Sequence, residues 1–537
     1  MSPPHAAPTA DQAQPSAVVI ENAFYEYVYK DGSKSKGLVD CSVTFPTGAR
    51  VVMMGANGSG KSTLLGVIAG MHKISSGRAI TLGSDSFADC NLQMRVARIG
   101  QAWPDNANWC ETVRQTAATY PNIDWVRFEN LCHLLHVDPE WRVDHCSSGM
   151  KRKIQVLLGL IYPKEMLCLD EFSADLDVVE REHILNYLKD ESVRNNVTIM
   201  YATHIFDNLG EWPTHILRMS QGKVLEMIDV AGIDRSMQSM AYELIRIDTG
   251  KQREQRNPFQ YTLQPLSPVV VETKDLFVRV GKANQGKFST ARVVLDGACL
   301  EVPKGSRCLL VGTNGSGKSS LMRVLAGKHF AAKGQAHINK RDAYHDTKLS
   351  DTVSHSLDWW QETEWDLCVA DVIHNVELDD RARDLVRILD VDMAWRMNRV
   401  SSGQRKRIQL LVNLLQFKEV LVLDEVTADL DVVQREEFLK FLYEESSKRG
   451  VTILYTTHIF EGMDGWPTQM VFLNAMTRDV EHVHYFKPGE IVLQEVERAL
   501  FPLKAAEWEK LGVTGSKYSR LGIQLAQKEA LGAAMQQ

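Results

Sequence analysis

The chain has 537 residues, a length that predicts two large domains or about three ordinary ones. Its 44% hydrophobic and 24% charged residues are typical of a folded, water-soluble protein, and its net charge of −7 argues against a protein that mainly coats nucleic acid. No run of 18 apolar residues is present, so we expect no membrane span, and nine scattered cysteines without a C-x-x-C pair exclude a zinc ribbon or an iron–sulfur domain.

The N-terminal segment 1–16 is rich in proline and alanine and contains no lysine or arginine. It lacks the charged and apolar regions of a signal peptide and the arginines of a transit peptide. We therefore expect a disordered tail. Together with the cysteines, which fit reduced thiols, this pattern predicts a cytoplasmic or nuclear protein.

A glycine-rich stretch, GANGSGKST, occupies residues 55–63 and fits the pattern G-x-x-x-x-G-K-[ST]. It lies between an apolar run and a helix-compatible segment. Glycines let backbone N–H groups turn toward an anion, and the start of a helix favours negative charge. Lys61 then reaches the β- and γ-phosphates of a nucleotide, and Ser62 offers a hydroxyl to Mg²⁺.

The same pattern returns as GTNGSGKSS at residues 312–320, with Lys318 and Ser319 in the same positions. Two longer stretches are also repeated, each at an offset of 254 residues, whereas the glycine loops are offset by 257. Such a long period indicates a duplicated domain rather than a solenoid. The expected organisation is a tail at 1–16, a first domain at 17–235, a linker at 236–268, a second domain at 269–490 and a C-terminal extension with helical leucine spacing at 491–537.

Both copies contain an apolar strand that ends in Asp-Glu, MLCLDE and VLVLDE. A buried strand delivers its aspartate, Asp170 or Asp424, to the shell of a Mg²⁺ ion. The next residue, a glutamate, is then placed to polarise an attacking water. A histidine follows each aspartate by 34 residues at the end of another apolar run, which predicts a polar contact of His204 and His458 with a γ-phosphate.

Two further short motifs occur in both copies: SSG at 147–149 and 401–403, and ADLD at 174–177 and 428–431. The motifs and their order along the chain resemble those of ATP-binding-cassette (ABC) ATPases, present twice in one chain. The resemblance implies an α/β fold of two ABC-type P-loop nucleotide-binding domains, each a mixed sheet core with a helical subdomain. It also implies hydrolysis of ATP with Mg²⁺ as cofactor, and it implies that the acids Asp177 and Asp431 communicate between the domains.

The resemblance implies that each signature loop completes the other domain's site and that an aromatic residue stacks on adenine. The candidate catalytic residues are Glu171, Glu425, His204 and His458. The candidate metal ligands are Ser62, Asp170, Ser319, Asp424 and Gln101. The candidate nucleotide-binding residues are Gly55, Asn57, Gly58, Ser59, Gly60, Lys61, Ser62, Thr63, Gly312, Asn314, Gly315, Ser316, Gly317, Lys318, Ser319, Ser320, Ser147, Gly149, Ser401, Gly403 and Tyr27.

The two sites are expected to be unequal. Tyr27 holds the position of the adenine-stacking aromatic in the first domain, and Val280 holds it in the second, unless another aromatic such as Phe288 takes this role. Both signatures have serine where the family has glycine, and the first also has Met150 where glutamine is usual. Because Ser147 and Gly149 serve the site of Lys318, the site of Lys61 is expected to bind ATP more tightly.

Several branches of the family compete. A transporter ATPase would couple to a membrane partner through a glutamine, present as Gln101 in the first domain but displaced to Gln361 in the second. A ribosome-associated translation ATPase of the duplicated class would usually carry a longer basic linker. Chromosome-maintenance and excision-repair ATPases would carry large insertions, yet Ser147 follows Lys61 by 86 residues and Ser401 follows Lys318 by 83.

The sequences around the histidines, THIFDNLGEWPT and THIFEGMDGWPT, are most similar to those of small soluble ABC ATPases associated with the CCR–NOT complex. This resemblance implies a protein or ribonucleoprotein complex as partner, with the ribosome as an alternative, and two domains that dimerise within the chain. Two hypotheses follow. Either ATP turnover drives work on that complex, or ATP only sets a closed state that the partner recognises.

Overall fold

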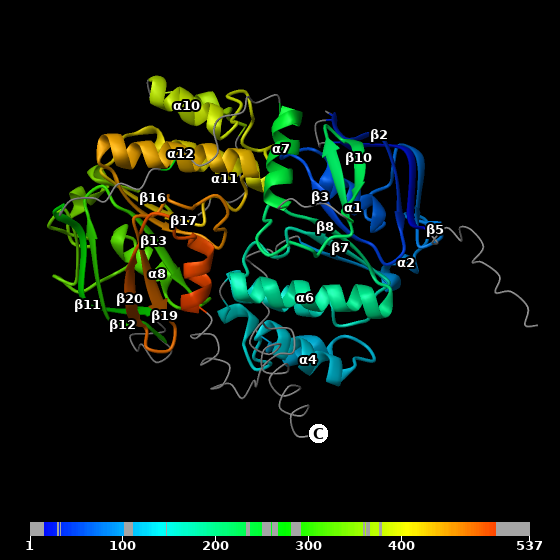
Figure 1. The fold of residues 1–537 in the computed structure, drawn as a ribbon, viewed down its shortest axis with the longest axis horizontal. Coiled ribbons are helices and arrows are strands. Elements are labelled where there is room, and N and C mark those ends of the chain that lie inside the picture. The colour runs from blue at the N-terminus through cyan, green and yellow to red at the C-terminus, as the bar shows by residue number, and fades with distance from the viewer. Residues whose placement is uncertain are drawn as a thin grey trace, which may run out of the picture.

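The computed structural model describes residues 16–28, 32, 34–100, 111–146, 148–231, 237–249, 259, 267–280, 292–357, 360, 366–374 and 378–500. Two parts of the chain repeat the same order of strands and helices (Figure 1). We call residues 16–231 the first half and residues 267–500 the second half. The predicted α/β class with two mixed-sheet domains is confirmed.

The first half alternates strands and helices after an initial antiparallel pair. Its elements are β1 (Ser16–Val28), β2 (Lys34–Pro46), β3 (Arg50–Met54), α1 (Lys61–Ile68), β4 (Ser76–Thr81), β5 (Ser84–Asp85), α2 (Leu92–Arg95), β6 (Val96–Ile99), α3 (Val113–Ala118), α4 (Trp125–Leu135), η1 (Val143–His145), α5 (Ser148–Gly159), β7 (Met166–Asp170), α6 (Val178–Asn195), β8 (Thr198–Ala202), β9 (His215–Ser220) and β10 (Lys223–Asp229).

The second half follows helix α7 (Met237–Thr249) and repeats this order. Its elements are β11 (Val269–Val280), β12 (Arg292–Pro303), β13 (Arg307–Gly312), α8 (Lys318–Leu325), β14 (Ala336–Ile338), β15 (Arg341–Asp342), η2 (Thr347–Asp351), β16 (Val353–Ser356), α9 (Val369–Val372), α10 (Asp380–Ile388), α11 (Ser402–Leu415), β17 (Val420–Asp424), α12 (Val432–Arg449), β18 (Thr452–Thr456), β19 (Gln469–Asn474) and β20 (Asp479–Tyr485).

A six-stranded sheet forms the centre of each half, in the order β10-β9-β3-β8-β7-β6 in the first and β20-β19-β13-β18-β17-β16 in the second. All neighbours are parallel except the outer pairs β9–β10 and β19–β20. All five residues of β3 are buried, as expected for a parallel strand covered on both faces. The carboxyl ends of parallel strands share one edge, which brings the ends of β3, β7 and β8 together.

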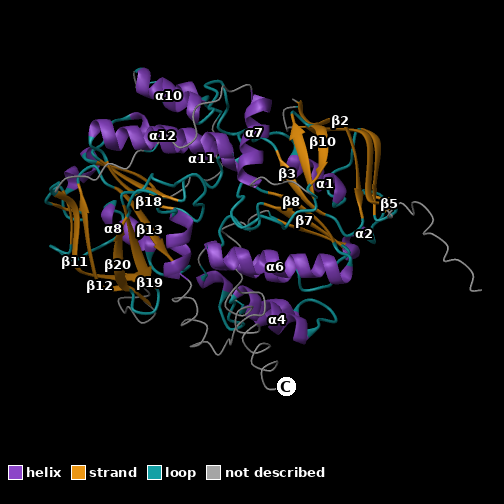
Figure 2. Cartoon of the chain, viewed as in Figure 1, coloured by secondary structure: helices purple, strands orange, loops and turns teal. Residues whose placement is uncertain are grey.

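Helices cover these sheets. In the first half, α6 packs on β8 and α4 packs on α6 (Figure 2). A separate four-stranded antiparallel sheet, β2-β1-β4-β5, lies beside the central one, and β12-β11-β14-β15 repeats it in the second half. No helix within the described ranges is long and apolar enough to cross a bilayer.

The two halves exchange apolar residues at their interface. Val178 and Val179, which begin α6, pack in the core of the second half, and Val432 and Val433, which begin α12, pack in the core of the first. All four side chains are buried. Each core is therefore completed by two residues from the other half.

Helix α7 lies within the segment 236–268 that the sequence suggested as a linker. Its apolar residues Met237, Met240, Ala241 and Ile245 belong to the core of the first half, and the helix contacts α12 of the second. Polar residues around these positions concealed the amphipathic face. At the other end of the second half, residues 492–500 are helical and bury Val492, Val496 and Leu500, whereas the rest of the expected C-terminal extension lies outside the described residues.

The exchanged valines predict how the halves can be separated. Replacing Val179 and Val433 with aspartate would bury an unpaired carboxylate in each partner core, which costs several kcal/mol. We expect the halves to part, with a larger radius of gyration in small-angle scattering. Val193→Asp on α6 is the control, because this valine is 68% exposed and its variant should keep the parent size. An unchanged radius in the double variant would contradict this account of the interface.

Candidate active site

The glycine loop of each half joins the central strand to an exposed helix start. Gly60 and Gly317, with φ of 100°, turn the chain just before α1 and α8. Neither helix has a side-chain N-cap, so the first backbone N–H groups face the loop rather than a side-chain acceptor. Such an uncapped start is a binding site for an anion. In the second loop, the buried hydroxyl of Ser316 also has no hydrogen-bond partner among the described residues.

Each loop encloses its lysine. The Nζ atom of Lys61 donates to the carbonyl oxygens of Gly55 at 2.7 Å and Ala56 at 3.1 Å, and Lys318 makes the equivalent contacts at the same distances. Burial lowers the pKa of Lys61, and the nearby Glu171, Asp431 and Asp170 oppose this shift. A buried ammonium group that contacts only neutral carbonyl oxygens is stabilised strongly by a negatively charged ligand.

The predicted metal ligands come together at the end of the aspartate strand. The Ser62 hydroxyl donates to Asp170 Oδ1 at 3.0 Å. In the second half, Asp424 accepts hydrogen bonds from Ser319 and Thr456. A hydroxyl beside a carboxylate supplies the hard oxygen ligands that Mg²⁺ prefers.

The glutamates that follow these aspartates adopt left-handed backbone conformations, with φ of 47° for Glu171 and 51° for Glu425. Such conformations are strained for a non-glycine residue and often mark functional sites. Each glutamate lies near the predicted histidine of its own half, at 3.4 Å for His204 Nε2 to Glu171 and 3.1 Å for His458 Nε2 to Glu425. Both predicted catalytic pairs are thus assembled.

The electrostatics of the two pairs differ. Burial raises the pKa of Glu171 to about 7, against the opposing effect of Lys61, although 37% of this side chain remains exposed. Burial, Lys61 and Arg435 hold the pKa of His204 well below its usual value. At Glu425, burial is outweighed by His458, Lys318 and Lys406, and the pKa is lowered. The pKa of the catalytic glutamate is therefore raised in the first site and lowered in the second.

Each glycine loop also reaches the opposite half. The Asn57 amide donates to the carbonyl oxygen of Asp429 at 3.0 Å and to Gln434 Oε1 at 3.3 Å. Its counterpart Asn314 donates to the carbonyl oxygen of Asp175 at 3.3 Å and to Glu180 Oε2 at 3.2 Å. The sequence offered no reason to separate these asparagines from the rest of the loop.

Of the signature residues, Gly149 lies where the two halves meet, and Gly403 lies beside Asp429 of its own half. Gly149 leaves just enough room for Asn314, because a Cβ atom there would lie 3.4 Å from the amide nitrogen. Ser401 caps α11, accepting a hydrogen bond from the Gln404 N–H at 3.2 Å. Asp177 and Asp431, expected to communicate between the domains, cap α6 and α12. Asp431 also acts electrostatically on Lys61 of the first half, and the carbonyl oxygens of Asp175 and Asp429 accept the hydrogen bonds across the interface.

An aromatic cluster stands beside the first glycine loop. The Tyr27 hydroxyl lies 2.8 Å from Thr63 Oγ1, and its ring meets that of Tyr25 edge-on at 5.0 Å. Tyr25 in turn stacks on His72 at 4.9 Å. At the corresponding place in the second half, Val280 is exposed and offers no ring.

Some expectations lie outside the described residues, namely those on Ser147, Gln101 and Phe288. Sequence reasoning also missed Arg98, whose guanidinium forms an ion pair with Asp170 at 3.1 Å. In the sheet register, Arg98 pairs with Cys168 and His355 pairs with Val422, which places a histidine at the corresponding position of the second half. The sequence alone identified the glycine motif and the Asp-Glu strand. It could not identify Arg98, because this residue lies on a neighbouring strand.

The described residues fit a nucleoside triphosphate with Mg²⁺. An uncapped helix start, an enclosed lysine and a serine–aspartate oxygen pair occur in each half, beside a strained glutamate and a histidine. All of these groups lie at the carboxyl edge of the central sheet, close to the opposite half.

Comparisons with known proteins agree with this geometry. A family model described as "ABC transporter" matches residues 38–174 and again 295–428. ABC transporter I family member 21 of Arabidopsis thaliana is 43% identical over 216 residues, which cover 37% of this chain and 77% of that protein. CCR4-associated factor 16 of Saccharomyces cerevisiae is 36% identical over 211 residues, covering 36% of this chain and 73% of that one.

Two further matches span both halves. The energy-dependent translational throttle protein EttA of Haemophilus influenzae is 25% identical over 469 residues, covering 74% of this chain and 82% of that protein. A solved structure of an RNase-L inhibitor shares the fold with a TM-score of 0.58 and 16% identity, covering 84% of this chain and 87% of that one. With the family model matched twice, on the two glycine loops and their strands, the chain belongs to the ABC transporter family and is a tandem ABC ATPase.

Proposed function

We propose that the chain binds and hydrolyses ATP at two composite sites between its halves, and that closure of the halves regulates or remodels a protein or ribonucleoprotein complex linked to CCR–NOT. The observation that carries the composite sites is the reciprocal reach of Asn57 and Asn314 into the opposite half. The proposal for the complex is supported by the 36% identity with CCR4-associated factor 16.

The first site is assigned to the loop of Lys61 with Glu171 and His204, completed by Ser401 and Gly403. Backbone N–H groups of the loop and Lys61 bind the phosphates. Mg²⁺, when bound to Ser62 and Asp170, would neutralise charge that develops on the phosphates. Glu171 orients the attacking water, and His204 contacts the γ-phosphate.

The second site is assigned to the equivalent residues of the other half. Lys318 and the loop around it bind the phosphates, and Ser319 and Asp424 would hold the metal. Glu425 and His458 orient the water and the γ-phosphate. Ser147 and Gly149 complete this site from the first half.

Fusion of the two halves changes the concentration dependence of assembly. A single-domain relative must find a second copy, whereas a tether holds the two halves at an effective concentration on the order of millimolar. Phosphate contacts at both sites then favour the closed state, and hydrolysis removes them. A partner complex would sense this change in shape.

A second candidate function has its own support. The match to EttA, a protein named for translational throttling, spans both halves and 74% of this chain. A duplicated ABC ATPase with such a relative is a candidate for a ribosome-associated role. The two candidates differ in the complex that the ATP-bound chain would join.

The catalytic assignment predicts the effect of removing both glutamates. The variant Glu171→Gln with Glu425→Gln should keep ATP binding and lose about 10²- to 10⁴-fold in hydrolysis rate, because no carboxylate orients the water. Phosphate release and the hydrodynamic radius with ATP are the measurements, and the radius should decrease. Glu444→Gln on the exposed side of α12 is the control. Parent-like turnover in the double variant would refute the assignment.

The aromatic cluster predicts unequal nucleotide affinity. In a Lys318→Ala background, Tyr27→Ala should weaken binding of an ATP analogue by about 5- to 150-fold, since stacking on a base contributes about 1–3 kcal/mol. Tyr27→Phe keeps the ring and removes only the contact with Thr63, so it should bind nearly as the parent does. In a Lys61→Ala background, Val280→Ala should change little. Equal affinities of the Lys61→Ala and Lys318→Ala proteins would rule out the asymmetry.

The partner can be identified with the same trapped protein. Affinity capture of the double glutamine variant with ATP, compared with ADP, should enrich subunits of the CCR–NOT complex. Enrichment of ribosomal particles would favour the translation role instead. Recovery of an ABC membrane subunit would show that the chain serves a transporter and would refute both.

A further inference from the structure

The loops that follow strands β8 and β18 are joined across the interface. The backbone N–H of Phe460 donates to Asp207 Oδ2 at 3.1 Å. In the reverse direction, the backbone N–H of Phe206 donates to the carboxylate of Glu461. Each loop thus contains an acid that accepts a hydrogen bond from the other loop. The histidines assigned to catalysis, His204 and His458, are the second residues of these loops.

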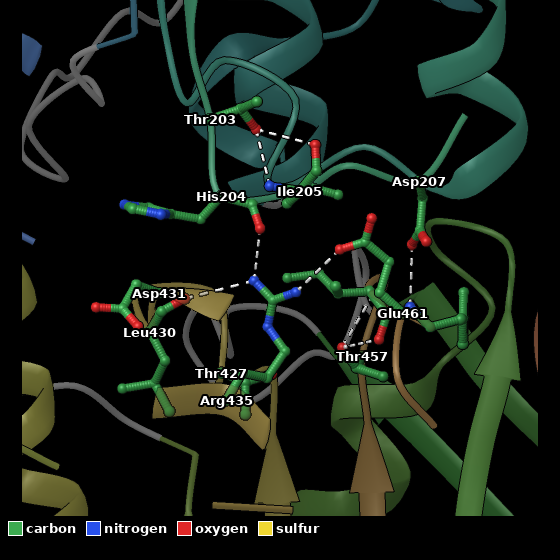
Figure 3. A network of polar contacts seen from close by, with 12 residues as sticks. Thr203, His204, Ile205, Asp207, Thr427, Leu430, Asp431, Arg435, Thr457 and Glu461 are labelled. Carbon is green, nitrogen blue, oxygen red and sulfur yellow. Dashed lines mark hydrogen bonds and ion pairs between the residues drawn. The ribbon is translucent and has the colours of Figure 1, made fainter. Parts of the chain in front are cut away.

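An arginine from the second half contacts the first of these histidines. Arg435, in the first turn of α12, donates through Nη2 to the carbonyl oxygen of His204 at 2.8 Å and to that of Leu430 at 3.4 Å. Its Nη1 atom lies 3.5 Å from Glu461 Oε2. Figure 3 shows the His204 carbonyl turned toward Arg435 while its imidazole ring points away from the network.

The first half supplies the matching contact. Arg181, in the first turn of α6, donates through Nη2 to the carbonyl oxygen of His458 at 3.0 Å and to that of Leu176 at 3.1 Å. Its Nη1 atom lies 3.8 Å from Asp207 Oδ2. Both arginines are buried, with 0% exposure for the Arg181 side chain and 3% for that of Arg435.

This geometry ties the arginine of one half to the catalytic group of the other. The bonded carbonyl belongs to the same residue as the imidazole, so the arginine fixes the backbone from which that side chain projects toward Glu171. The second half already meets this site through Asp429, which accepts from Asn57. Arg435 therefore contacts the site of Lys61, and it does so only while the interface is assembled.

We propose that Arg435 and Arg181 are positioning residues that act on the opposite half, Arg435 orienting His204 in the first site and Arg181 orienting His458 in the second. This inference rests on the proposed hydrolysis at both sites. The acids Glu461 and Asp207 compensate the buried guanidinium groups and link the two loops. A histidine is then correctly oriented only when the other half is docked, which prevents turnover by an open chain.

A purely structural role for the arginines predicts a different pattern. If they only held the halves together, removing either would weaken both sites alike and would also weaken ATP binding. A positioning role predicts that each arginine affects turnover at one site, the one in the opposite half. Because the affected step follows binding, kcat should change and the nucleotide Kd should not.

The test isolates one site at a time. Glu425→Gln leaves turnover to the first site, and Glu171→Gln leaves it to the second. Into each background we would introduce a charge-balanced pair, either Arg435→Met with Glu461→Gln or Arg181→Met with Asp207→Asn. Glutamine and asparagine retain a carbonyl oxygen that can accept the N–H bond of the opposite loop, so the change removes charge and the arginine contact while preserving that link.

We expect a crossed result in kcat. With only the first site active, the Arg435 pair should lose about 10- to 100-fold and the Arg181 pair much less, since misplacing a catalytic group by about 1 Å costs up to about 10²-fold. With only the second site active, the order should reverse. The Kd for a nucleotide analogue should stay within about threefold of that of the background, as expected when only the reacting geometry changes.

Controls and second variants keep the outcome decisive. Arg194→Met on the exposed end of α6 should behave as the parent, because this side chain is 66% exposed. If a methionine variant fails to fold, Arg435→Lys and Arg181→Lys should give the same crossed pattern with smaller losses. Equal losses at both sites would overturn the positioning role. Absence of any effect of Glu171→Gln and Glu425→Gln on turnover would instead refute the proposed function itself.

Discussion

The amide of Asn57 bonds to a backbone carbonyl of the other half, and Asn314 repeats the contact in the opposite direction. This reciprocal reach is the constraint on which the rest of the structure depends. It requires the two glycine loops to face the opposite half. The apolar counterpart is the exchange of the valines that begin α6 and α12 between the two cores. Polar and apolar contacts at the interface thus favour the same docked arrangement.

Within this nearly twofold frame the two sites are chemically distinct. The first has an aromatic cluster around Tyr27 and an arginine, Arg98, paired with its candidate metal ligand Asp170. The second has Val280 and His355 in those places. Burial raises the pKa of Glu171, whereas the neighbouring cations lower that of Glu425. The two halves share the groups assigned to phosphate binding and differ in the surrounding groups, and from these differences we predict unequal binding and turnover at the two sites.

Much of this account could be read from the sequence because its signals are local. A glycine loop, an Asp-Glu strand and a histidine recur at constant offsets, and each acts through residues adjacent in the chain. The buried cross-links could not be read in this way. Arg435 contacts the carbonyl of a residue 231 positions earlier, and helix α7 lies in a stretch whose overall polarity concealed its apolar face. Arg181 and Arg435 occupy the same position in the two copies of the repeat, which was the only hint in the sequence. Many core residues are repeated in the same way, so this hint did not single out the arginines.

The central claim is that each site draws on both halves, and one comparison of ATP hydrolysis tests it most directly. In a Lys318→Ala background only the first site is available. Gly403→Glu should then abolish most of the remaining turnover by placing a carboxylate against the γ-phosphate. The site has room for this side chain, because a Cβ atom at Gly403 would lie 3.8 Å from the nearest neighbour, the Asp429 side chain. Gly149→Glu in the same background crowds Asn314 but should reduce turnover much less than Gly403→Glu, because Gly149 is assigned to the site of Lys318. The reverse order of activities would contradict the composite arrangement.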